Sequence, residues 1–317
     1  MSDPRLDPEM RAFNAMMEER AARLPPIRLA LPFDEPRALT EALNLPLAEG
    51  GPRMAESGDR WLPVRGRRLL CRFHRPAAGP GPLPVLLYIH GGGWVWNSVD
   101  THDRLMREYA AAAGCTVLGP DYALSPEAAF PQALEECAQV LRWVAARGGE
   151  WGLDPTRLVL GGDSAGANLA LGAALLLRDA GALPPLRGLL LNYGVFDSRL
   201  DTPSYGEFAT GYGLTRERMA FYWRCYAPRE TDRVHPYAAP LRAELGGLPP
   251  TLLQIAELDV LASENHAMAE RLRAAGVTVE ARLAQGTVHG FLRALGHVRA
   301  AEEAVAAAGR WLAARFA

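Results

Sequence analysis

Gly162-Asp163-Ser164-Ala165-Gly166 places a serine in the setting that a nucleophile needs. A short apolar strand is predicted directly before this pentapeptide, and an apolar helix is predicted directly after Ser164. A turn this tight forces its central residue into a strained backbone conformation that lifts the side chain clear, and the flanking glycines let strand and helix approach. The pattern therefore predicts Ser164 as a nucleophile, with an ordinary glycine-rich turn as the alternative.

His90-Gly91-Gly92-Gly93-Trp94 follows another predicted strand and has the composition of an oxyanion-binding loop. A tetrahedral intermediate places negative charge on the former carbonyl oxygen, and backbone N–H groups reach that oxygen only where no Cβ obstructs them. We expect Gly91 and Gly92 to supply two donors, and Ala165, the residue after the nucleophile, to supply a third. A glycine-rich loop without this role is the alternative.

A serine nucleophile needs a base, and histidine is the natural one because all 34 Lys+Arg positions of the chain are arginine. Of the seven histidines, His289 follows the last predicted strand in a loop, where this base is expected. The other histidines fall in or beside helices, in an early strand, in the oxyanion motif or in a separate aromatic region: His74, His90, His102, His235, His266 and His297.

The acid that orients the histidine should follow a strand and precede His289 in the chain. Asp259 meets both conditions, because it lies just beyond the strand expected at 251–256. Asp197, after the preceding strand, is the competitor, and Glu257 is a weaker one. The order Ser164, Asp259, His289 matches the Ser–Asp–His order of hydrolases built on a strand-to-helix elbow.

The absence of lysine also excludes a P-loop or kinase-type phosphate contact, a Schiff base and a serine–lysine hydrolase. A net charge of −2 and a pI of about 6.4 give no reason to expect nucleic acid or an anionic membrane as a partner. The most apolar runs are too short to span a bilayer, and the polar N-terminal residues do not resemble a secretory signal. We therefore expect a cytoplasmic protein.

The four cysteines of the chain lack metal or redox spacing and are expected to be buried free thiols.

These residues must be positioned by strands and helices that alternate along the middle and end of the chain, which is typical of an α/β fold with a mostly parallel sheet. Strands are expected at 84–90, 116–119, 157–161, 189–193, 251–256 and 277–283, and helices at 103–113, from 131 onward, at 165–177 and near 302–315.

Two regions interrupt this alternation. Residues 1–60 look helical and proline-punctuated, with no strand expected before Trp61, and residues 198–246 contain aromatic, arginine-rich helical segments. Ligands bind at the carboxyl ends of the strands in such sheets. We therefore interpret both regions as a discontinuous helical cap over that end, with 61–197 and 247–317 as the catalytic core.

Taken together, the sequence resembles the hormone-sensitive-lipase family of α/β-hydrolases, and within it the bacterial acetyl esterases and carboxylesterases. The resemblance covers most of the chain from about Trp61 onward and rests on five motifs: His90-Gly-Gly-Gly-Trp94, Thr101-His-Asp-Arg104, Asp121-Tyr-Ala-Leu-Ser-Pro-Glu127 with Phe130-Pro131, Gly162-Asp-Ser-Ala-Gly166 and His289-Gly-Phe291. It implies an α/β-hydrolase fold with a mostly parallel eight-stranded sheet flanked by helices and a helical cap.

The resemblance also implies roles and a reaction. Ser164 would be the nucleophile, His289 the general base and Asp259 its partner, with Gly91, Gly92 and Ala165 as the oxyanion hole. The reaction implied is hydrolysis of a small short-acyl ester through an acyl-enzyme, with no metal or organic cofactor. Members are often dimers, so a homodimer is possible for this chain.

Members commonly carry Asp-Pro-Leu at the acid, whereas Val260 replaces the proline here. We expect this change to loosen the loop that presents Asp259 and to leave its carboxylate in place. Trp94, Trp96 and Tyr193 are candidates to line the acyl and alcohol pockets, with packing in the core or cap as the alternative. An amidase or formamidase with the same triad, or a non-catalytic receptor on the same scaffold, are the alternative functions.

Overall fold

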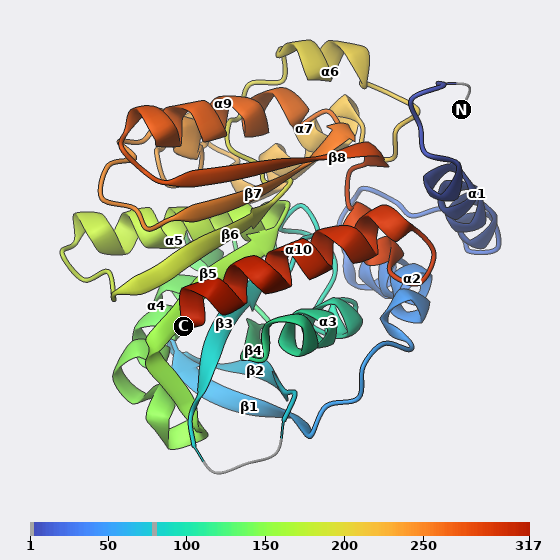
Figure 1. The fold of residues 1–317 in the computed structure, drawn as a ribbon. Coiled ribbons are helices and arrows are strands. Elements are labelled where there is room, and N and C mark those ends of the chain that lie inside the picture. Colours follow the sequence, from blue (N-terminus) through green and yellow to red (C-terminus); the bar gives the residue numbers. More distant parts are fainter. Residues whose placement is uncertain (1–2, 78–80) are drawn as a thin grey trace.

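An eight-stranded sheet runs through the computed structural model, which describes residues 3–77 and 81–317, in the strand order β1-β2-β4-β3-β5-β6-β7-β8 (Figure 1). β2 pairs antiparallel with β1 and β4, and all other neighbours are parallel. The predicted mostly parallel sheet of eight strands is therefore confirmed. The strands are β1 (Glu56–Val64), β2 (Arg67–Arg75), β3 (Leu83–Ile89), β4 (Thr116–Pro120), β5 (Leu153–Asp163), β6 (Leu186–Asn192), β7 (Thr251–Leu258) and β8 (Val279–Val288).

The central strands are buried on both faces, as continuous apolar runs in a parallel sheet should be. β4 is buried throughout, and β3 is buried from its second residue onward. The expectation that no strand precedes Trp61 is wrong, because β1 begins at Glu56. Its first residues are mostly exposed and polar on the edge of the sheet, so they carry no apolar pattern that would reveal a strand.

Helices cover both faces of the sheet. In Figure 1, α3 and α10 lie together in front of the sheet, whereas α4 and α5 lie behind it. α9 packs against β7 and β8. The bounds are α3 (Asp103–Ala113), α4 (Gln132–Arg147), η2 (Gly148–Trp151), α5 (Ala165–Asp179), α9 (Ala262–Ala274), η4 (Phe291–Ala294) and α10 (Arg299–Phe316).

The two regions outside the strand–helix alternation are helical. The first lies at the right of Figure 1, where α1 contacts α2, β8 and η4. The second, which includes α6 and α7, lies near the top of the same view. The bounds are α1 (Pro8–Ala22), α2 (Asp34–Asn44), η1 (Leu45–Ala48), α6 (Pro203–Glu207), α7 (Arg216–Tyr226), α8 (Glu230–Arg233) and η3 (Pro240–Arg242).

The four cysteines are free and buried, as predicted. Burial raises the pKa of the Cys115 thiol to about 12, which keeps that side chain protonated and inert near neutrality. Among the helices of residues 3–77 and 81–317, none has the length and apolar character needed to cross a membrane.

Candidate active site

Ser164 occupies the turn between β5 and α5, and its backbone is strained as the sequence predicted. Its φ of 54° and ψ of −119° are unusual for a residue with a Cβ. The turn is fixed by the Ser164 N–H, which donates to the carbonyl oxygen of Asn192 at 2.9 Å. A Cβ on Gly162 would lie 2.6 Å from the carbonyl carbon of Gly166, so the glycines are required by close backbone approach.

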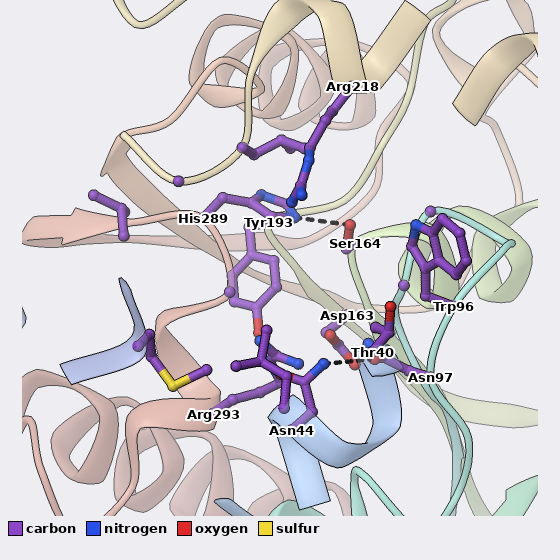
Figure 2. Close-up of a pocket in the computed structure, with 18 of the residues that line it drawn as sticks. Thr40, Asn44, Trp96, Asn97, Asp163, Ser164, Tyr193, Arg218, His289 and Arg293 are labelled. Atoms are coloured by element: carbon purple, nitrogen blue, oxygen red, sulfur yellow. Dashed lines mark hydrogen bonds between the residues drawn. The ribbon is translucent and has the colours of Figure 1, made fainter. Parts of the chain in front are cut away.

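His289 and Asp259 complete a hydrogen-bonded chain with Ser164 (Figure 2). The Nε2 atom of His289 lies 2.8 Å from Ser164 Oγ, and its Nδ1 atom lies 2.7 Å from Asp259 Oδ2. A carboxylate only accepts hydrogen bonds, so Nδ1 carries the proton and Nε2 accepts from the serine hydroxyl. The arrangement therefore presents a serine oxygen to a neutral imidazole nitrogen that is free to take its proton.

The loop that presents Asp259 is well held despite the absence of proline at Val260. Asp259 is 1% exposed, and its Oδ1 accepts a hydrogen bond from the Leu261 N–H at 3.1 Å. The carbonyl oxygen of Val260 accepts from Ser204 Oγ at 2.6 Å, which ties the loop to α6. Burial and these two bonds fix the carboxylate that faces His289.

The competing acids are engaged elsewhere. Asp197 accepts from Arg199 at 2.8 Å and from Arg242 at 3.2 Å. Glu257 accepts from the Gly286 N–H at 2.7 Å. Neither carboxylate is bonded to His289.

The glycine loop after β3 uses its N–H groups differently from the expectation. The Gly91 N–H donates to the Asp163 carboxylate at 3.0 Å and is therefore not available to a substrate, so the expected role of Gly91 is not supported. Gly92 and Gly93 line the pocket around Ser164, and their N–H groups donate to no other group of the described residues. Ala165 begins α5, so its N–H lacks an intrahelical acceptor. Gly93 is therefore a candidate donor that the sequence did not reveal.

Asp163 holds the glycine loop that follows β3. Besides the Gly91 N–H, its Oδ1 accepts from the Tyr88 hydroxyl at 3.0 Å and lies 3.4 Å from His102 Nε2. Burial raises the pKa of the Asp163 carboxyl, but the charge of His102 and the hydrogen bonds from His102 and Tyr88 outweigh it, so the pKa lies below its ordinary value. An ionised Asp163 thus holds the loop next to the nucleophile.

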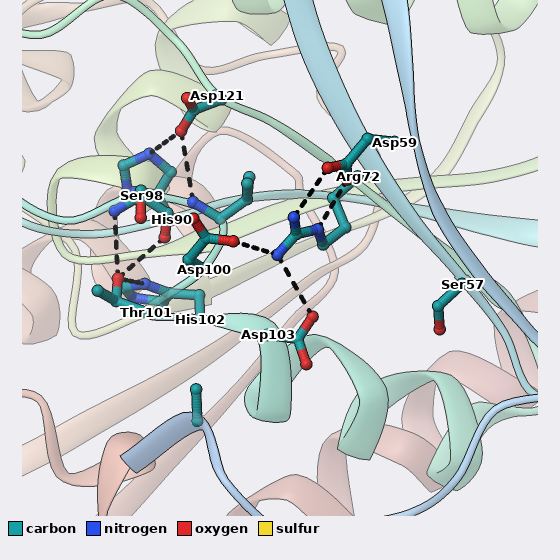
Figure 3. A network of polar contacts seen from close by, with 12 residues as sticks. Ser57, Asp59, Arg72, His90, Ser98, Asp100, Thr101, His102, Asp103 and Asp121 are labelled. Atoms are coloured by element: carbon teal, nitrogen blue, oxygen red, sulfur yellow. Dashed lines mark hydrogen bonds and ion pairs between the residues drawn. The ribbon is translucent and has the colours of Figure 1, made fainter. Parts of the chain in front are cut away.

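A polar network supports the same loop from the side of β2 (Figure 3). Arg72 binds Asp59 at 2.8 Å, contacts Asp100, and lies 3.6 Å from Asp103. His74 Nε2 lies 3.2 Å from Asp103. Burial raises the pKa of the Asp103 carboxyl, but the interactions with His74 and Arg107 lower it by more, so that the pKa is about 2. These contacts fix the segment that leads from the glycine loop into α3.

His90, at the start of the loop, is buried and neutral. Its ring stacks on Tyr122 with 4.3 Å between ring centroids, and its Nδ1 atom lies 2.9 Å from the carbonyl oxygen of Gly91. Burial lowers the pKa of His90 to about 3, and the charge of His102 acts in the same direction. The carboxylate of Asp121, 4.0 Å away, does not reverse this effect.

His90→Gln is expected to remove part of the acid sensitivity of folding. A histidine with a lowered folded-state pKa does not affect stability above its unfolded pKa of about 6.5, and destabilises the fold as pH falls below that value, because only the unfolded state is then protonated. Between pH 7.5 and pH 5 the wild type should lose on the order of 2 kcal/mol more than the variant. Urea unfolding of both proteins at the two pH values measures this difference, and equal losses would contradict the neutral, buried state of His90.

The Ser164 side chain opens into a pocket of about 300 Å³. Trp96 and Tyr193 line it, as expected, whereas Trp94 does not. The Trp94 ring is fully buried and stacks on Tyr226 at 4.2 Å, because a φ of 62° turns its side chain beneath the loop into the core. The other lining residues come from both helical regions and from the loops around the triad: Met10, Phe13, Asn14, Met17, Ile27, Leu29, Thr40, Leu43, Asn44, Gly92, Gly93, Asn97, Asp163, Gly213, Leu214, Arg218, Tyr222, Val288, His289, Gly290 and Arg293.

Comparison with known proteins gives a consistent result. A family model described as alpha/beta hydrolase fold matches residues 86–293. The chain is 38% identical over 247 residues to carboxylesterase NlhH of Mycobacterium tuberculosis, covering 77% of this chain and 76% of that protein. It is 36% identical over 240 residues to the acetyl esterase of Salmonella schwarzengrund, covering 75% and 74%. A thermostable esterase from Pseudomonas putida ECU1011 superposes with a TM-score of 0.93 at 35% identity, covering 100% of this chain and 99% of that one.

Proposed function

The chain belongs to the α/β-hydrolase fold family, and we propose that it is a serine carboxylesterase that hydrolyses short-acyl, acetyl-type esters. The α/β-hydrolase fold predicted from the sequence is confirmed by the family match. The resemblance to the hormone-sensitive-lipase family and its bacterial esterases is confirmed by carboxylesterase and acetyl esterase relatives at 38% and 36% identity. The alternatives of an amidase and of a non-catalytic receptor receive no support from these relatives.

The observation that carries the proposal is the continuous hydrogen-bonded chain from Asp259 through His289 to Ser164 at the pocket. In the mechanism that follows, Nε2 of His289 takes the hydroxyl proton as Ser164 Oγ attacks the ester carbonyl. His289 then gives this proton to the leaving alcohol. His289 then takes a proton from a water molecule that attacks the acyl carbonyl. The bond between the acyl group and Ser164 Oγ breaks, the carboxylic acid leaves, and His289 returns the proton to Oγ. Asp259 holds the imidazole in the required tautomer and stabilises the charged ring that forms.

The oxyanion of each tetrahedral intermediate is assigned to the N–H groups of Gly92, Gly93 and Ala165. Support comes from their position on the pocket loop and helix start and from the absence of competing acceptors among the described residues for the two glycines. Gly91 has a different role, because its N–H is bonded to Asp163 and fixes the loop. The N-terminus of α5 adds a favourable dipole next to the developing charge.

Residues 1–55 and 198–246 form the cap of this enzyme, and residues 56–197 and 247–317 form its catalytic core. The first boundary lies before residue 60, where the sequence placed it, because β1 begins at Glu56. This division is supported by the lining of the pocket. Thr40 of α2 and Tyr222 of α7 come from the two helical regions, whereas Ser164 comes from the core. Substrate is therefore held between two segments that are far apart in the sequence.

A chain-length series of 4-nitrophenyl esters, from two to twelve acyl carbons, tests the short-acyl specificity. We expect kcat/KM to peak at two to four carbons and to fall at least tenfold for the longest esters. The pocket of about 300 Å³ lies at the small end of the range for ligand sites, and the Tyr222 ring lies against Gly93 beside the nucleophile. A peak at eight carbons or more would contradict the short-acyl specificity, and equal rates on matched esters and amides would favour the amidase.

A further inference from the structure

Two arginine side chains line the pocket without an acidic partner in the part of the chain that the structure describes. Arg218 belongs to α7 and lies at the exposed rim, and Arg293 belongs to η4 and is half-buried. In Figure 2, the Arg218 guanidinium lies at the end of the pocket where Ser164 and His289 are hydrogen-bonded. The Arg293 guanidinium lies near the hydroxyl group of Tyr193. The mechanism uses neither side chain.

The lining of the pocket leaves this positive charge unbalanced. Among the described residues that line the pocket, Asp163 carries the only carboxylate, and this group is held by the Gly91 N–H and the Tyr88 hydroxyl. Many arginines elsewhere are paired, as Arg37 is with Glu127 at 2.6 Å. Electrostatic attraction is stronger in a partly closed pocket than in water, so an anionic group that enters the pocket is attracted.

Two neutral donors in the same pocket also lack partners. The hydroxyl oxygen of Tyr193 and the Nδ2 atom of Asn14 are buried, and neither is hydrogen-bonded to the described residues. Burial raises the pKa of Tyr193 well above its ordinary value, so the phenol remains an O–H donor, although the charge of Arg293 opposes this shift. A buried donor without an acceptor destabilises the site, and a ligand oxygen that accepts from it would remove this penalty.

We propose, on the basis of the esterase function proposed above, that the pocket selects esters that carry a free carboxylate in addition to the ester bond. Arg293 binds this carboxylate, and Tyr193 and Asn14 donate hydrogen bonds to its oxygens. A carboxylate has two oxygens that accept several hydrogen bonds, and it matches the planar fork of a guanidinium. Arg218, at the nucleophile end, adds long-range attraction.

The carboxylate can belong to either half of the ester, and two matched substrate pairs distinguish the sources. Monoethyl succinate and its amide, ethyl succinamate, place the group on the acyl side. 2-Acetoxypropanoate and its amide, 2-acetoxypropanamide, place it on the alcohol side. Within each pair the shape is nearly constant and only the charge changes, so the ratio of kcat/KM for acid over amide reports recognition of the carboxylate.

We expect the wild type to prefer the carboxylate about tenfold or more in at least one pair, which is the size of one hydrogen bond to a charged group. Arg293→Met should bring that ratio close to one, and Arg293→Lys, which keeps the charge, should retain a ratio above one. The wild-type preference should also fall between about 0.02 M and about 0.5 M salt, because salt screens charges at a partly open site. Arg224→Met is the matched control, because Arg224 is an exposed residue of α7 that does not line the pocket.

Two results would overturn the inference and leave the proposed function in place, provided that 4-nitrophenyl acetate is hydrolysed. The first is an acid-to-amide ratio near one in both pairs for the wild type. The second is an acid-to-amide ratio in Arg293→Met that equals the ratios of the wild type and of Arg224→Met. If instead the wild type hydrolyses none of the esters, including 4-nitrophenyl acetate, the proposed function itself is wrong.

Discussion

Ser164→Ala is expected to lower kcat on 4-nitrophenyl acetate by about four orders of magnitude or more, with little change in stability. We propose the Oγ atom as the nucleophile. Within residues 3–77 and 81–317 its one hydrogen bond is to His289, so the rest of the described fold does not depend on it. The unusual backbone at Ser164 is imposed by the turn, and alanine meets the same constraint as serine there. Steady-state kinetics and thermal unfolding of both proteins measure the two effects.

Ser57 provides a matched control for this experiment. Its Oγ lies 2.8 Å from His74 Nδ1, and His74 Nε2 lies 3.2 Å from Asp103, so the three residue types of the triad are repeated there. Ser57 is exposed on the edge strand β1 and does not line the pocket. Ser57→Ala should therefore retain wild-type activity, and an organophosphate should label the wild type and Ser57→Ala but not Ser164→Ala. A folded Ser164→Ala protein with ester turnover within tenfold of wild type would contradict the role of Ser164.

The triad could be predicted from the sequence because each member is marked by local pattern and chain order. Gly162 and Gly166 identify the elbow at Ser164, and parallel strands bring their carboxyl ends to one edge of the sheet. Asp259 and His289 follow the last two strands, so the topology alone places them near the nucleophile although His289 is 125 residues away from Ser164. The absence of lysine narrowed the choice of base further.

The oxyanion loop and the pocket walls are harder to predict from the sequence, because they depend on backbone direction rather than on residue type. A run of three glycines does not show which N–H faces Asp163 and which faces the pocket. The sequence therefore predicts Gly91 as an oxyanion donor, whereas the Gly91 N–H is bonded to Asp163 and the Gly93 N–H is free at the pocket. Trp94 was expected in the pocket for the same reason, since its direction is set by one positive φ. Arg293 carried no signal among 34 arginines, because only the fold shows that it lines the pocket and lacks a partner.

The close approach of β3 and α5 can be tested through Gly166. A Cβ at Gly166 would collide with the carbonyl oxygen of Ile89 and lie 2.6 Å from the Ile89 carbonyl carbon and 2.7 Å from the carbonyl oxygen of His90. All three are backbone atoms, so a rotamer change cannot relieve the contact, and the strand and helix must separate.

Gly166→Ala should therefore destabilise the fold on the order of 4 kcal/mol or more, a large part of the 5–15 kcal/mol that typical proteins possess. Activity should fall with it, because β3 leads directly into the loop of Gly92 and Gly93.

Gly206→Ala is the control: Gly206 is exposed in α6, and its added Cβ meets no atom within 4 Å. That change should be neutral or stabilise the protein by about 0.5–1 kcal/mol, because alanine favours helix more than glycine does. Urea unfolding of the three proteins measures both effects. If Gly166→Ala unfolded within about 1 kcal/mol of wild type, strand and helix could not be packed as closely as the elbow at Ser164 requires.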